Sequence, residues 1–258
     1  MREDQLIRYS RQIMLPEIDA AGQLRLANAR VLIIGLGGLG SPASIYLTAG
    51  GVGHLTLVDY DRVDLSNLQR QIVHRTRDIE RKKVESAADH LKELNPDVKL
   101  ALIDHALEDA ELHKEVAGAD VIIDATDNFR TRHAINRACF EHGRPLVSAA
   151  AIRFEAQISV FDSRFPDSPC YHCLYPEDAV VDATCTANGV IAPLLGIVGS
   201  IQAAEAMKLI MGIGKTLTGR LLLVDLMTME WHNTRLPKDQ SCPVCGHAAR
   251  RPKAEVTP

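Results

Sequence analysis

Four cysteines occur as two closely spaced pairs, and their spacing points directly to a kind of chemistry. Cys170 and Cys173 enclose two residues, and so do Cys242 and Cys245. Two such pairs offer four thiolates to one tetrahedral ion and leave it no open position, which is typical of a structural zinc site. We therefore predict Zn²⁺ at these cysteines, with a role in folding and none in catalysis.

A glycine-rich turn follows a short apolar segment at residues 30–34. Its glycines are Gly35, Gly37, Gly38 and Gly40. Glycines let the backbone approach a phosphate closely, and the N-terminus of a following helix favours negative charge. Asp59 ends the next apolar run, where its carboxylate could accept hydrogen bonds from ribose hydroxyls. The pattern predicts nucleotide binding without deciding between NAD, FAD and ATP.

Cations and another carboxylate follow at positions that a dinucleotide would not require. Arg70 and Lys83 come after the second apolar run, and Asp127 comes after the fourth. The carboxyl ends of parallel strands meet at one edge of a sheet, so these groups should converge. A triphosphate carries more charge than NAD and travels with Mg²⁺, so its site needs cations and a carboxylate for the metal. We favour ATP with Mg²⁺, while Asp127 and Asn128 are equally suited to capping a helix.

These residues must be positioned by alternating strands and helices. Residues 1–29 predict an amphipathic helical segment, broken near Pro16 and Gly22. Apolar strands are predicted at residues 30–34, 54–59, 98–103, 120–123 and 145–148, and helices at 39–49, 79–94, 107–117 and 129–142. Strands that are apolar on both faces and alternate with helices indicate a Rossmann-like α/β fold, with a mostly parallel central sheet and helices on both faces.

The second half of the chain has a different pattern. Residues 152–161 alternate as an antiparallel strand does, and a long polar loop follows them. A helix near 190–211 and strands at 220–224 and 228–233 come next, so the sheet should continue into an antiparallel part with a zinc-stapled C-terminal region. We divide the chain into four parts, namely 1–29 (helical), 30–150 (nucleotide-binding), 151–247 (carrier-binding and zinc part of the same domain) and 248–258 (disordered tail).

The overall composition argues against several classes of function. The chain has 29 Lys and Arg against 33 Asp and Glu, a formal charge of −4, so no basic field exists to hold nucleic acid. The N-terminus mixes charges every few residues and lacks the apolar core of a signal peptide. The longest apolar stretch, 190–201, contains Pro193, Gly196 and Gly199 and is too short to span a bilayer. We expect a buried helix there and a cytoplasmic protein.

Several motifs together resemble the ubiquitin-activating-type adenylyltransferases, whose bacterial members include the ThiF and MoeB proteins of thiamin and molybdopterin biosynthesis. The motifs are RYSRQI, GLGGLG, SNLQRQ, the lysine before VES, ATDN, CYHC and CPVC, in order from about residue 5 to residue 247. The resemblance implies ATP-dependent adenylation of the C-terminal carboxylate of a ubiquitin-like sulfur carrier protein. Such a carrier, ThiS-like or MoaD-like, ends in Gly-Gly, and the products would be an acyl-adenylate and pyrophosphate.

The resemblance also implies roles for individual residues. Asp59 would bind the ribose of ATP, and Asp127 would bind Mg²⁺ and be the most damaging single residue to lose. Arg70 and Lys83 would be catalytic, on the nucleotide phosphates. The other implied nucleotide-binding positions are Gly35, Gly37, Gly38, Gly40, Asp61, Ser66, Asn67, Leu68, Gln69 and Asn128.

Two further residues have a functional and an ordinary interpretation. Arg11 resembles a family arginine that reaches the ATP site of a partner subunit, which would make the enzyme a homodimer; it is otherwise an ordinary helix residue. Cys185 resembles a cysteine linked to sulfur transfer or covalent attachment of the carrier; it is otherwise a loop cysteine without a chemical role. Because adenylation needs no thiol, Cys185→Ser should keep ATP–pyrophosphate exchange. Sulfur would come from a separate donor, such as a cysteine desulfurase or a rhodanese.

Some alternatives stay open at this point. The family usually has a non-basic residue before the catalytic lysine, whereas Lys82 precedes Lys83 here. We choose Lys83 because the following Val-Glu-Ser sets the register. The competing functions are an NAD-dependent oxidoreductase on the same fold, the inactive half of a heterodimeric activating enzyme, and an enzyme that adenylates a small molecule or a tRNA modification. The sequence also leaves open which carrier is used.

Overall fold

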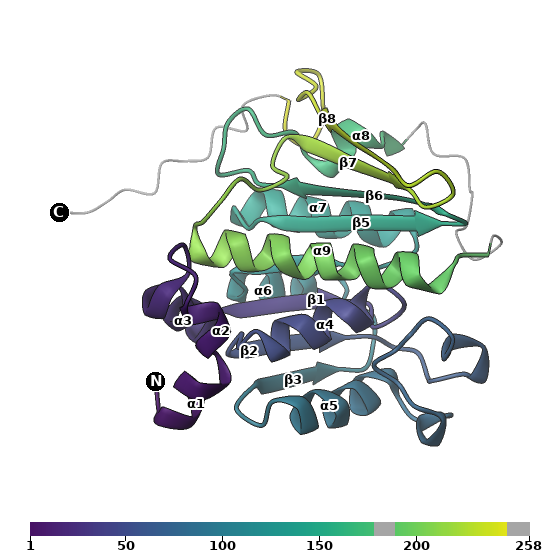
Figure 1. Cartoon of the computed structure of the whole chain (residues 1–258). Coiled ribbons are helices and arrows are strands. Elements are labelled where there is room, and N and C mark those ends of the chain that lie inside the picture. The colour runs from purple at the N-terminus through teal and green to yellow at the C-terminus, as the bar shows by residue number, and fades with distance from the viewer. Residues whose placement is uncertain (178–188, 247–258) are drawn as a thin grey trace.

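One mixed β-sheet runs through the protein, which this computed structural model describes at residues 1–177 and 189–246. Its eight strands lie in the order β3-β2-β1-β4-β5-β6-β7-β8 (Figure 1). Strands β1 to β5 pair in parallel, and the pairing becomes antiparallel from β5 to β8. The predicted Rossmann-like sheet with an antiparallel continuation is therefore confirmed.

The parallel strands are short and almost entirely buried near the centre. Burial on both faces explains their continuous apolar sequence, because helices cover a parallel sheet on each side. The strands are β1 (Arg30–Ile34), β2 (His54–Val58), β3 (Lys99–Ile103), β4 (Val121–Asp124), β5 (Leu146–Ile152), β6 (Glu155–Phe161), β7 (Arg220–Asp225) and β8 (Glu230–Arg235).

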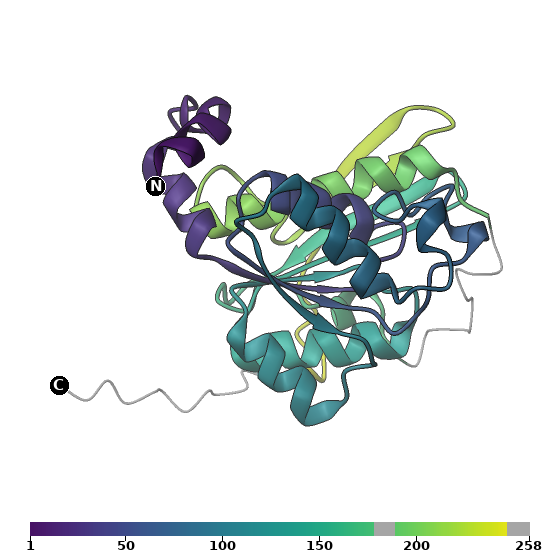
Figure 2. The ribbon, with the colours of Figure 1, turned by 90° about the horizontal axis from the view of Figure 1, so that it is seen from below.

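Helices form a layer on each face of the sheet. Figure 2 shows α4, α5 and α9 on one face and α6 and α7 on the other, with α1 to α3 at one end. The helices are α1 (Glu3–Arg8), α2 (Ser10–Ile13), α3 (Asp19–Asn28), α4 (Gly40–Ala49), α5 (Lys83–Leu94), α6 (Asp109–Gly118), α7 (Phe129–His142), α8 (Tyr171–Leu174) and α9 (Ala192–Met211). Each layer encloses its own group of buried apolar side chains, and Cys139 belongs to the group beside α6 and α7.

Helix α9 is the apolar helix that the sequence predicted, and it is longer than the apolar stretch from which it was predicted. With 20 residues it is long and apolar enough, by length and composition alone, to cross a membrane. Half of it is buried, however, because it packs across β4, β5 and β6 and against α4. At Gly199 a Cβ atom would lie 2.4 Å from the carbonyl oxygen of Leu39, so glycine lets α9 approach the start of α4.

Several predicted element boundaries were wrong for local reasons. Helix α5 begins at Lys83 and not at residue 79, because Glu80 has a positive φ of 69°. Helix α3 runs through Gly22, where a break was predicted, since Gly22 is buried against Ile18. Ile152 ends β5 and does not begin the next strand: a tight turn at Arg153, with φ 53°, folds β5 onto β6. Strand β8 begins at Glu230, two residues later than predicted.

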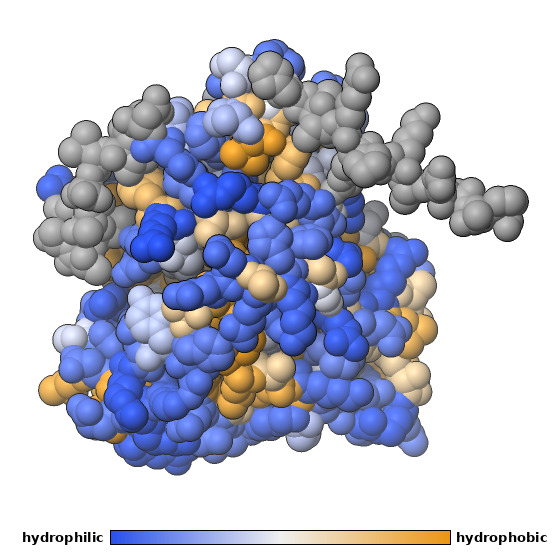
Figure 3. Space-filling model, turned by 180° about the vertical axis from the view of Figure 1, so that it is seen from behind, coloured by the Kyte–Doolittle hydropathy of each residue, from blue (hydrophilic) through white to orange (hydrophobic). Residues whose placement is uncertain are grey.

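The outer surface is mostly polar on the side of α6 and α7. Figure 3 shows this face, where hydrophobic side chains form small, separated groups among hydrophilic ones. The larger exposed hydrophobic side chains elsewhere include a group on the N-terminal helices, namely Leu6, Ile7, Met14 and Leu15.

Candidate functional site

A cavity of about 1200 Å³ opens at the carboxyl ends of β1, β2 and β4. Strand β1 has β2 on one side and β4 on the other, so the loops that follow β1 and β4 lead to opposite sides of the sheet. They leave a crevice between them, which is where open α/β sheets bind ligands. The structure brings most of the predicted nucleotide-binding residues to this cavity. They are Gly35, Gly37, Gly38, Asp59, Asp61, Asn67, Gln69, Arg70, Lys83, Asp127 and Asn128.

The glycine turn lies against the backbone of the neighbouring β4 segment. Gly35 has φ 96°, and a Cβ atom there would lie 2.6 Å from the carbonyl oxygen of Ala125. At Gly40 a Cβ atom would lie 1.9 Å from the carbonyl oxygen of Gly35. Both positions therefore exclude any side chain. At Gly37, by contrast, a Cβ atom would meet only the Gln71 amide at 3.6 Å, so this glycine faces open space.

Asp59 ties the glycine turn to the end of β2. Its Oδ2 accepts a hydrogen bond of 2.7 Å from the Leu36 N–H, and its Oδ1 accepts one of 2.9 Å from the Asp61 N–H. Burial raises the pKa of the Asp59 carboxyl above its ordinary value, and the nearby Lys83 opposes that rise. The carboxylate thus shapes the turn and still lines the cavity, where it can accept a further hydrogen bond.

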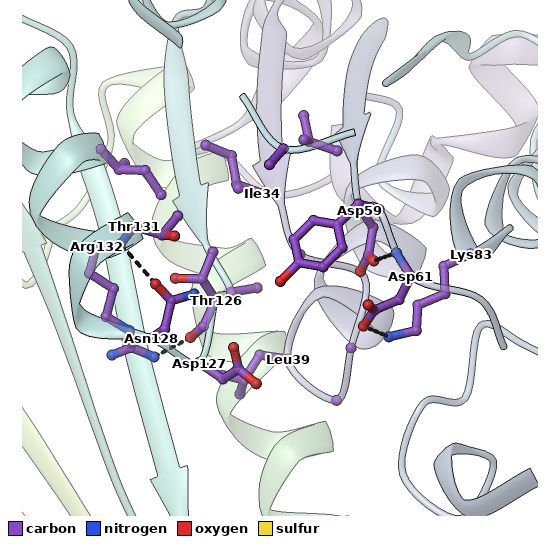
Figure 4. A pocket seen from close by; sticks show the side chains of 18 of the residues that line it. Ile34, Leu39, Asp59, Asp61, Lys83, Thr126, Asp127, Asn128, Thr131 and Arg132 are labelled. Atoms are coloured by element: carbon purple, nitrogen blue, oxygen red, sulfur yellow. Dashed lines mark hydrogen bonds and ion pairs between the residues drawn. The ribbon is translucent and has the colours of Figure 1, made fainter. Parts of the chain in front are cut away.

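The structure separates the two candidate lysines. Lys83 is buried and lines the cavity, and its Nζ lies 2.8 Å from Oδ2 of the half-exposed Asp61 (Figure 4). Lys82 is more exposed, pairs with Asp104, and is not among the residues that line the cavity. The geometry therefore favours Lys83 as the lysine that meets a ligand, and its catalytic role stays a prediction.

Two arginines add positive charge to the cavity without being neutralised within it. Arg70 donates a hydrogen bond of 2.9 Å to the carbonyl oxygen of Ser66, which fixes its side chain after the 3-10 turn Leu65–Asn67. Arg130 lies exposed in the first turn of α7. Neither forms an ion pair with a carboxylate in the described part of the chain. Both guanidinium groups are therefore available to an anion.

The loop after β4 is held by a buried carboxylate and a buried arginine. Asp124 accepts hydrogen bonds from the Thr126 N–H at 3.0 Å and from the hydroxyls of Thr126 and Ser148 at 2.6 and 2.7 Å. Arg132 donates to the carbonyl oxygens of Thr126 and, at 3.1 Å, of Ala149. These contacts fix the loop between β4 and α7, so the residues that follow Thr126 have a defined position.

Asp127 and Asn128 have different places in this loop. The Asn128 side chain caps α7 by accepting a hydrogen bond of 2.9 Å from the Thr131 N–H. Asp127 is exposed, lines the cavity, and accepts no hydrogen bond from the described residues. Figure 4 shows the two across the cavity from Asp59, Asp61 and Lys83. The free carboxylate and the opposing cations suit a metal-bound polyphosphate.

The structure leaves some predicted residues outside the cavity. Gly40, Ser66 and Leu68 lie next to it without lining it, and the hydroxyl of Ser66 is bound to Asp64 at 2.5 Å. Arg11 is exposed on α2, away from the cavity of its own chain. Cys185 and the tail at 248–258 lie outside the described residues, so their predictions stay untested.

Several polar residues that line the cavity were not predicted from the sequence. They are Tyr60, Gln71, Glu108, Asp109, Thr126, Arg130, Thr131 and Arg132. Gln71 is buried, and its Oε1 has no partner in the described residues. Gln71 ends the SNLQRQ motif and Thr126 belongs to ATDN, so both motifs carried a signal. Arg130 is in the first turn of the helix predicted at 129–142, close in sequence to Asp127 and Asn128, which placed it near the same loop.

The four cysteines of the predicted zinc site converge on one point. Their Sγ atoms all lie within 4.8 Å of one another, with 3.7 Å from Cys170 to Cys242 and 3.3 Å from Cys173 to Cys245. Four thiolates around a zinc ion are about 3.8 Å apart, whereas a disulfide brings two sulfur atoms to about 2.05 Å. The arrangement can therefore hold zinc, and the cysteines are not paired as disulfides.

The surroundings of the cysteines also suit a bound cation. Hydrogen bonding among the thiols lowers the pKa of Cys173 and raises the pKa of Cys170, so the cysteines of the cluster interact directly. Nδ1 of His172 lies 3.6 Å from Sγ of Cys242. Because α8 packs against α7 and Cys242 follows β8, a metal here would connect the antiparallel edge of the sheet to the helical layer.

Comparisons with known proteins agree with this geometry. The model of the ThiF family matches residues 9–244. The molybdopterin-synthase adenylyltransferase of Escherichia coli is 45% identical over 95% of this chain and 98% of its own length. The sulfur carrier protein ThiS adenylyltransferase of the same organism is 44% identical over 95% of this chain and 97% of its own. Among solved structures, PaaA superposes with a TM-score of 0.79 at 26% identity, over 93% of this chain and 76% of its own.

We predict one zinc ion per chain, because four thiolates satisfy its tetrahedral coordination. Elemental analysis of the natively purified protein should find zinc at one equivalent. Cys242→Ser should lose most of this zinc and lower the melting temperature, whereas Cys139→Ser, which changes a buried cysteine that is not one of the four, should keep the zinc. Native protein without zinc would contradict the prediction.

Proposed function

The chain belongs to the ThiF family, and from this we propose that it adenylates the C-terminal carboxylate of a ubiquitin-like sulfur carrier protein, using ATP. The observation that carries the proposal is the charge arrangement of the cavity. Lys83, Arg70 and Arg130 approach it from separate elements, and Asp127, which has no partner among the described residues, lies opposite Lys83. A pyrophosphate group alone would need fewer cations and no free carboxylate, so this arrangement favours ATP over NAD.

The reaction needs positioning and charge stabilisation more than covalent help from the protein. A carboxylate oxygen of the carrier attacks the α-phosphorus and forms a new P–O bond. The bond from that phosphorus to the bridging oxygen breaks, and pyrophosphate leaves with the electron pair. Arg70, Lys83 and Arg130 would stabilise the negative charge that develops on the phosphate oxygens. The N–H groups of Gly37 and Gly38, just before α4, would add partial positive charge.

The ribose and the metal-bound phosphates of ATP have candidate partners in the cavity. Asp59 would accept hydrogen bonds from the ribose hydroxyls, since it directly follows β2 beside the glycine turn. Asp127 fits a Mg²⁺ ion because its carboxylate is exposed and without a protein partner in the described region. When bound, Mg²⁺ would neutralise phosphate charge and orient the triphosphate. We assign the part of the chain from residue 151 onward to carrier binding, on the side of the cavity formed by Ala151, Gly189 and Val190.

We also propose that the enzyme acts as a homodimer in the cytoplasm. Arg11 is exposed, forms no ion pair with the described residues, and lies near the exposed Ile7 and Met14 of the N-terminal helices. An apolar surface beside a free arginine suits a contact in which Arg11 reaches the ATP of a partner subunit. A reducing compartment would keep the four zinc-binding thiols free of disulfides.

The homodimer makes a prediction about mixed subunits. Arg11→Ala and Lys83→Ala should each be inactive alone, but a dimer with one subunit of each type keeps one complete site. Mixing the two variants under conditions in which dimers exchange their subunits should therefore restore part of the ATP–pyrophosphate exchange activity. A mixture as inactive as its components, in a sample shown to contain mixed dimers, would contradict the shared site.

The two lysines provide a matched pair for the ATP site. Lys83→Ala should lower the rate of carrier-dependent ATP–pyrophosphate exchange by roughly 10²- to 10³-fold, because it removes a cation that stabilises the transition state. Lys82→Ala should leave the rate within about twofold, because Lys82 pairs with Asp104 outside the cavity and that exposed ion pair contributes little. If the Lys82→Ala enzyme were inactive and the Lys83→Ala enzyme active, Lys82 would be the catalytic lysine.

The carrier can be identified by direct adenylation. The purified enzyme, incubated with Mg·ATP and a ThiS-like or a MoaD-like protein, should add one AMP to the carrier, detected as a mass increase of the intact protein. A carrier that lacks its last glycine is the control and should stay unmodified. Supplying a cysteine desulfurase or a rhodanese should then convert the adenylate to the thiocarboxylate, which tests the separate sulfur donor. If no Gly-Gly-ended carrier gains AMP, the proposed function is wrong.

A further inference from the structure

A buried histidine connects three of the elements that surround the nucleotide cavity. His74 is only 5% exposed and follows Arg70 by four residues. Its Nε2 lies 3.1 Å from the carbonyl oxygen of Leu36 in the glycine turn. Its Nδ1 lies 2.9 Å from Oγ of Ser86, which is in α5 one turn after Lys83. No step of the reaction described above uses this side chain.

The hydrogen atoms of the imidazole can be assigned from its partners. Burial lowers the pKa of His74 to about 4; Lys83 and His90 lower it too, while Asp78 and the bond to Leu36 raise it. The ring is therefore neutral at neutral pH and carries one hydrogen. A carbonyl oxygen only accepts, so Nε2 carries the hydrogen and donates it to Leu36. Nδ1 lies within hydrogen-bond distance of the Ser86 hydroxyl, which also bonds to the Asp78 carboxylate.

The bond to Leu36 determines the direction of the next N–H group. The carbonyl of Leu36 and the N–H of Gly37 belong to one planar peptide unit and point in opposite directions. Because His74 holds the carbonyl on the protein side, the N–H of Gly37 must point the other way. Gly37 lines the cavity, and its N–H has no acceptor in the described parts of the chain. The Ser41 hydroxyl is a second, longer donor to the same carbonyl, at 3.3 Å.

The Leu36 residue is thus held at both of its polar groups. Asp59 accepts from its N–H at 2.7 Å, and His74 donates to its carbonyl at 3.1 Å. A glycine-rich turn is otherwise free to rotate its peptide units, because glycine has few steric restrictions. Asp59 therefore holds the Gly35–Leu36 peptide, and His74 holds the Leu36–Gly37 peptide that follows it.

We propose that His74 is a positioning residue that orients the Leu36–Gly37 peptide so that the Gly37 N–H faces the phosphates of the bound nucleotide. The inference rests on the proposed function, because it takes ATP to be the ligand. It does not place His74 in contact with the substrate. Loss of the hydrogen bond from His74 should weaken binding of the phosphates and leave binding of the nucleoside unchanged.

Two amide substitutions separate the roles of the two ring nitrogens. The amide nitrogen of glutamine reaches about as far as Nε2, so His74→Gln keeps a donor for Leu36. The amide of asparagine reaches only the position of Nδ1, so His74→Asn keeps a polar group near Ser86 but loses the bond to Leu36. Calorimetric titration of the full-length variants gives their affinity for Mg·ATP and, separately, for adenosine, which lacks the phosphates. Melting temperatures show whether each variant is folded.

The two variants should differ in their affinity for Mg·ATP and not in their affinity for adenosine. His74→Asn should bind Mg·ATP about tenfold more weakly than wild type, the effect of one misplaced hydrogen-bond donor to a charged group. His74→Gln should bind Mg·ATP nearly as well as wild type, and both variants should bind adenosine as wild type does. Equal ATP affinity of the two variants, or a parallel loss of ATP and adenosine affinity, would overturn the inference. Wild-type protein that binds adenosine but not ATP would instead overturn the proposed function on which it rests.

A measurement on the wild-type protein keeps the inference testable if the asparagine variant does not fold. The backbone amide resonance of Gly37, assigned by ¹⁵N labelling, should shift on addition of Mg·ATP and not on addition of adenosine. The amide of Gly118, which ends α6 away from the glycine turn, is an internal control and should not move with either ligand. A Gly37 amide that is unaffected by ATP would mean that His74 does not direct it to the phosphates.

Discussion

The sheet grows in opposite directions from β1, first to β2 and β3 and then to β4 and β5, and the site depends on this constraint. Because β2 and β4 flank β1 in parallel, three strand ends open toward the same edge, and the loops that follow them must diverge around a crevice. The glycine turn, Asp59 and the loop with Asp127 are the continuations of these strands. Their backbone contacts are so close that Gly35 has no room for a Cβ atom beside Ala125. The position of each polar group follows from this crowding.

The cavity lining carries charges of both signs, although the chain as a whole has a net charge of −4. Arg70 and Arg130 face the cavity without a carboxylate partner in the described part of the chain, and Lys83 pairs with the half-exposed Asp61. Carboxylates line the same cavity, namely those of Asp59, Asp61, Glu108, Asp109 and Asp127. A polyphosphate with its metal can use both kinds of group, the cations for its phosphate oxygens and a carboxylate for the metal, which a neutral ligand would not need.

The antiparallel half of the sheet extends the nucleotide-binding part without forming a separate layer. Strand β6 pairs directly with β5, and α9 crosses both halves, so the cavity and the zinc site share one rigid framework. The cysteines lie where the chain leaves β8 and returns to the helical layer beside α7. A metal at this point would close the end of the sheet where the chain offers few apolar contacts, since every residue of β8 is exposed.

The sequence by itself determined the fold class, the nucleotide turn and the four-cysteine site, because each depends on short-range patterns. Apolar runs predicted β1 to β4 within a residue or two, and the spacing of the cysteines predicted their convergence. Tertiary structure alone decided which charged groups reach the cavity. It separated Lys83 from Lys82, which are adjacent in sequence, and it made Asn128 a cap while Asp127 has no partner within residues 1–177 and 189–246. It also brought His74 to Leu36, 38 residues away in the chain. Such choices depend on which way a side chain points after packing, and no local pattern encodes that direction.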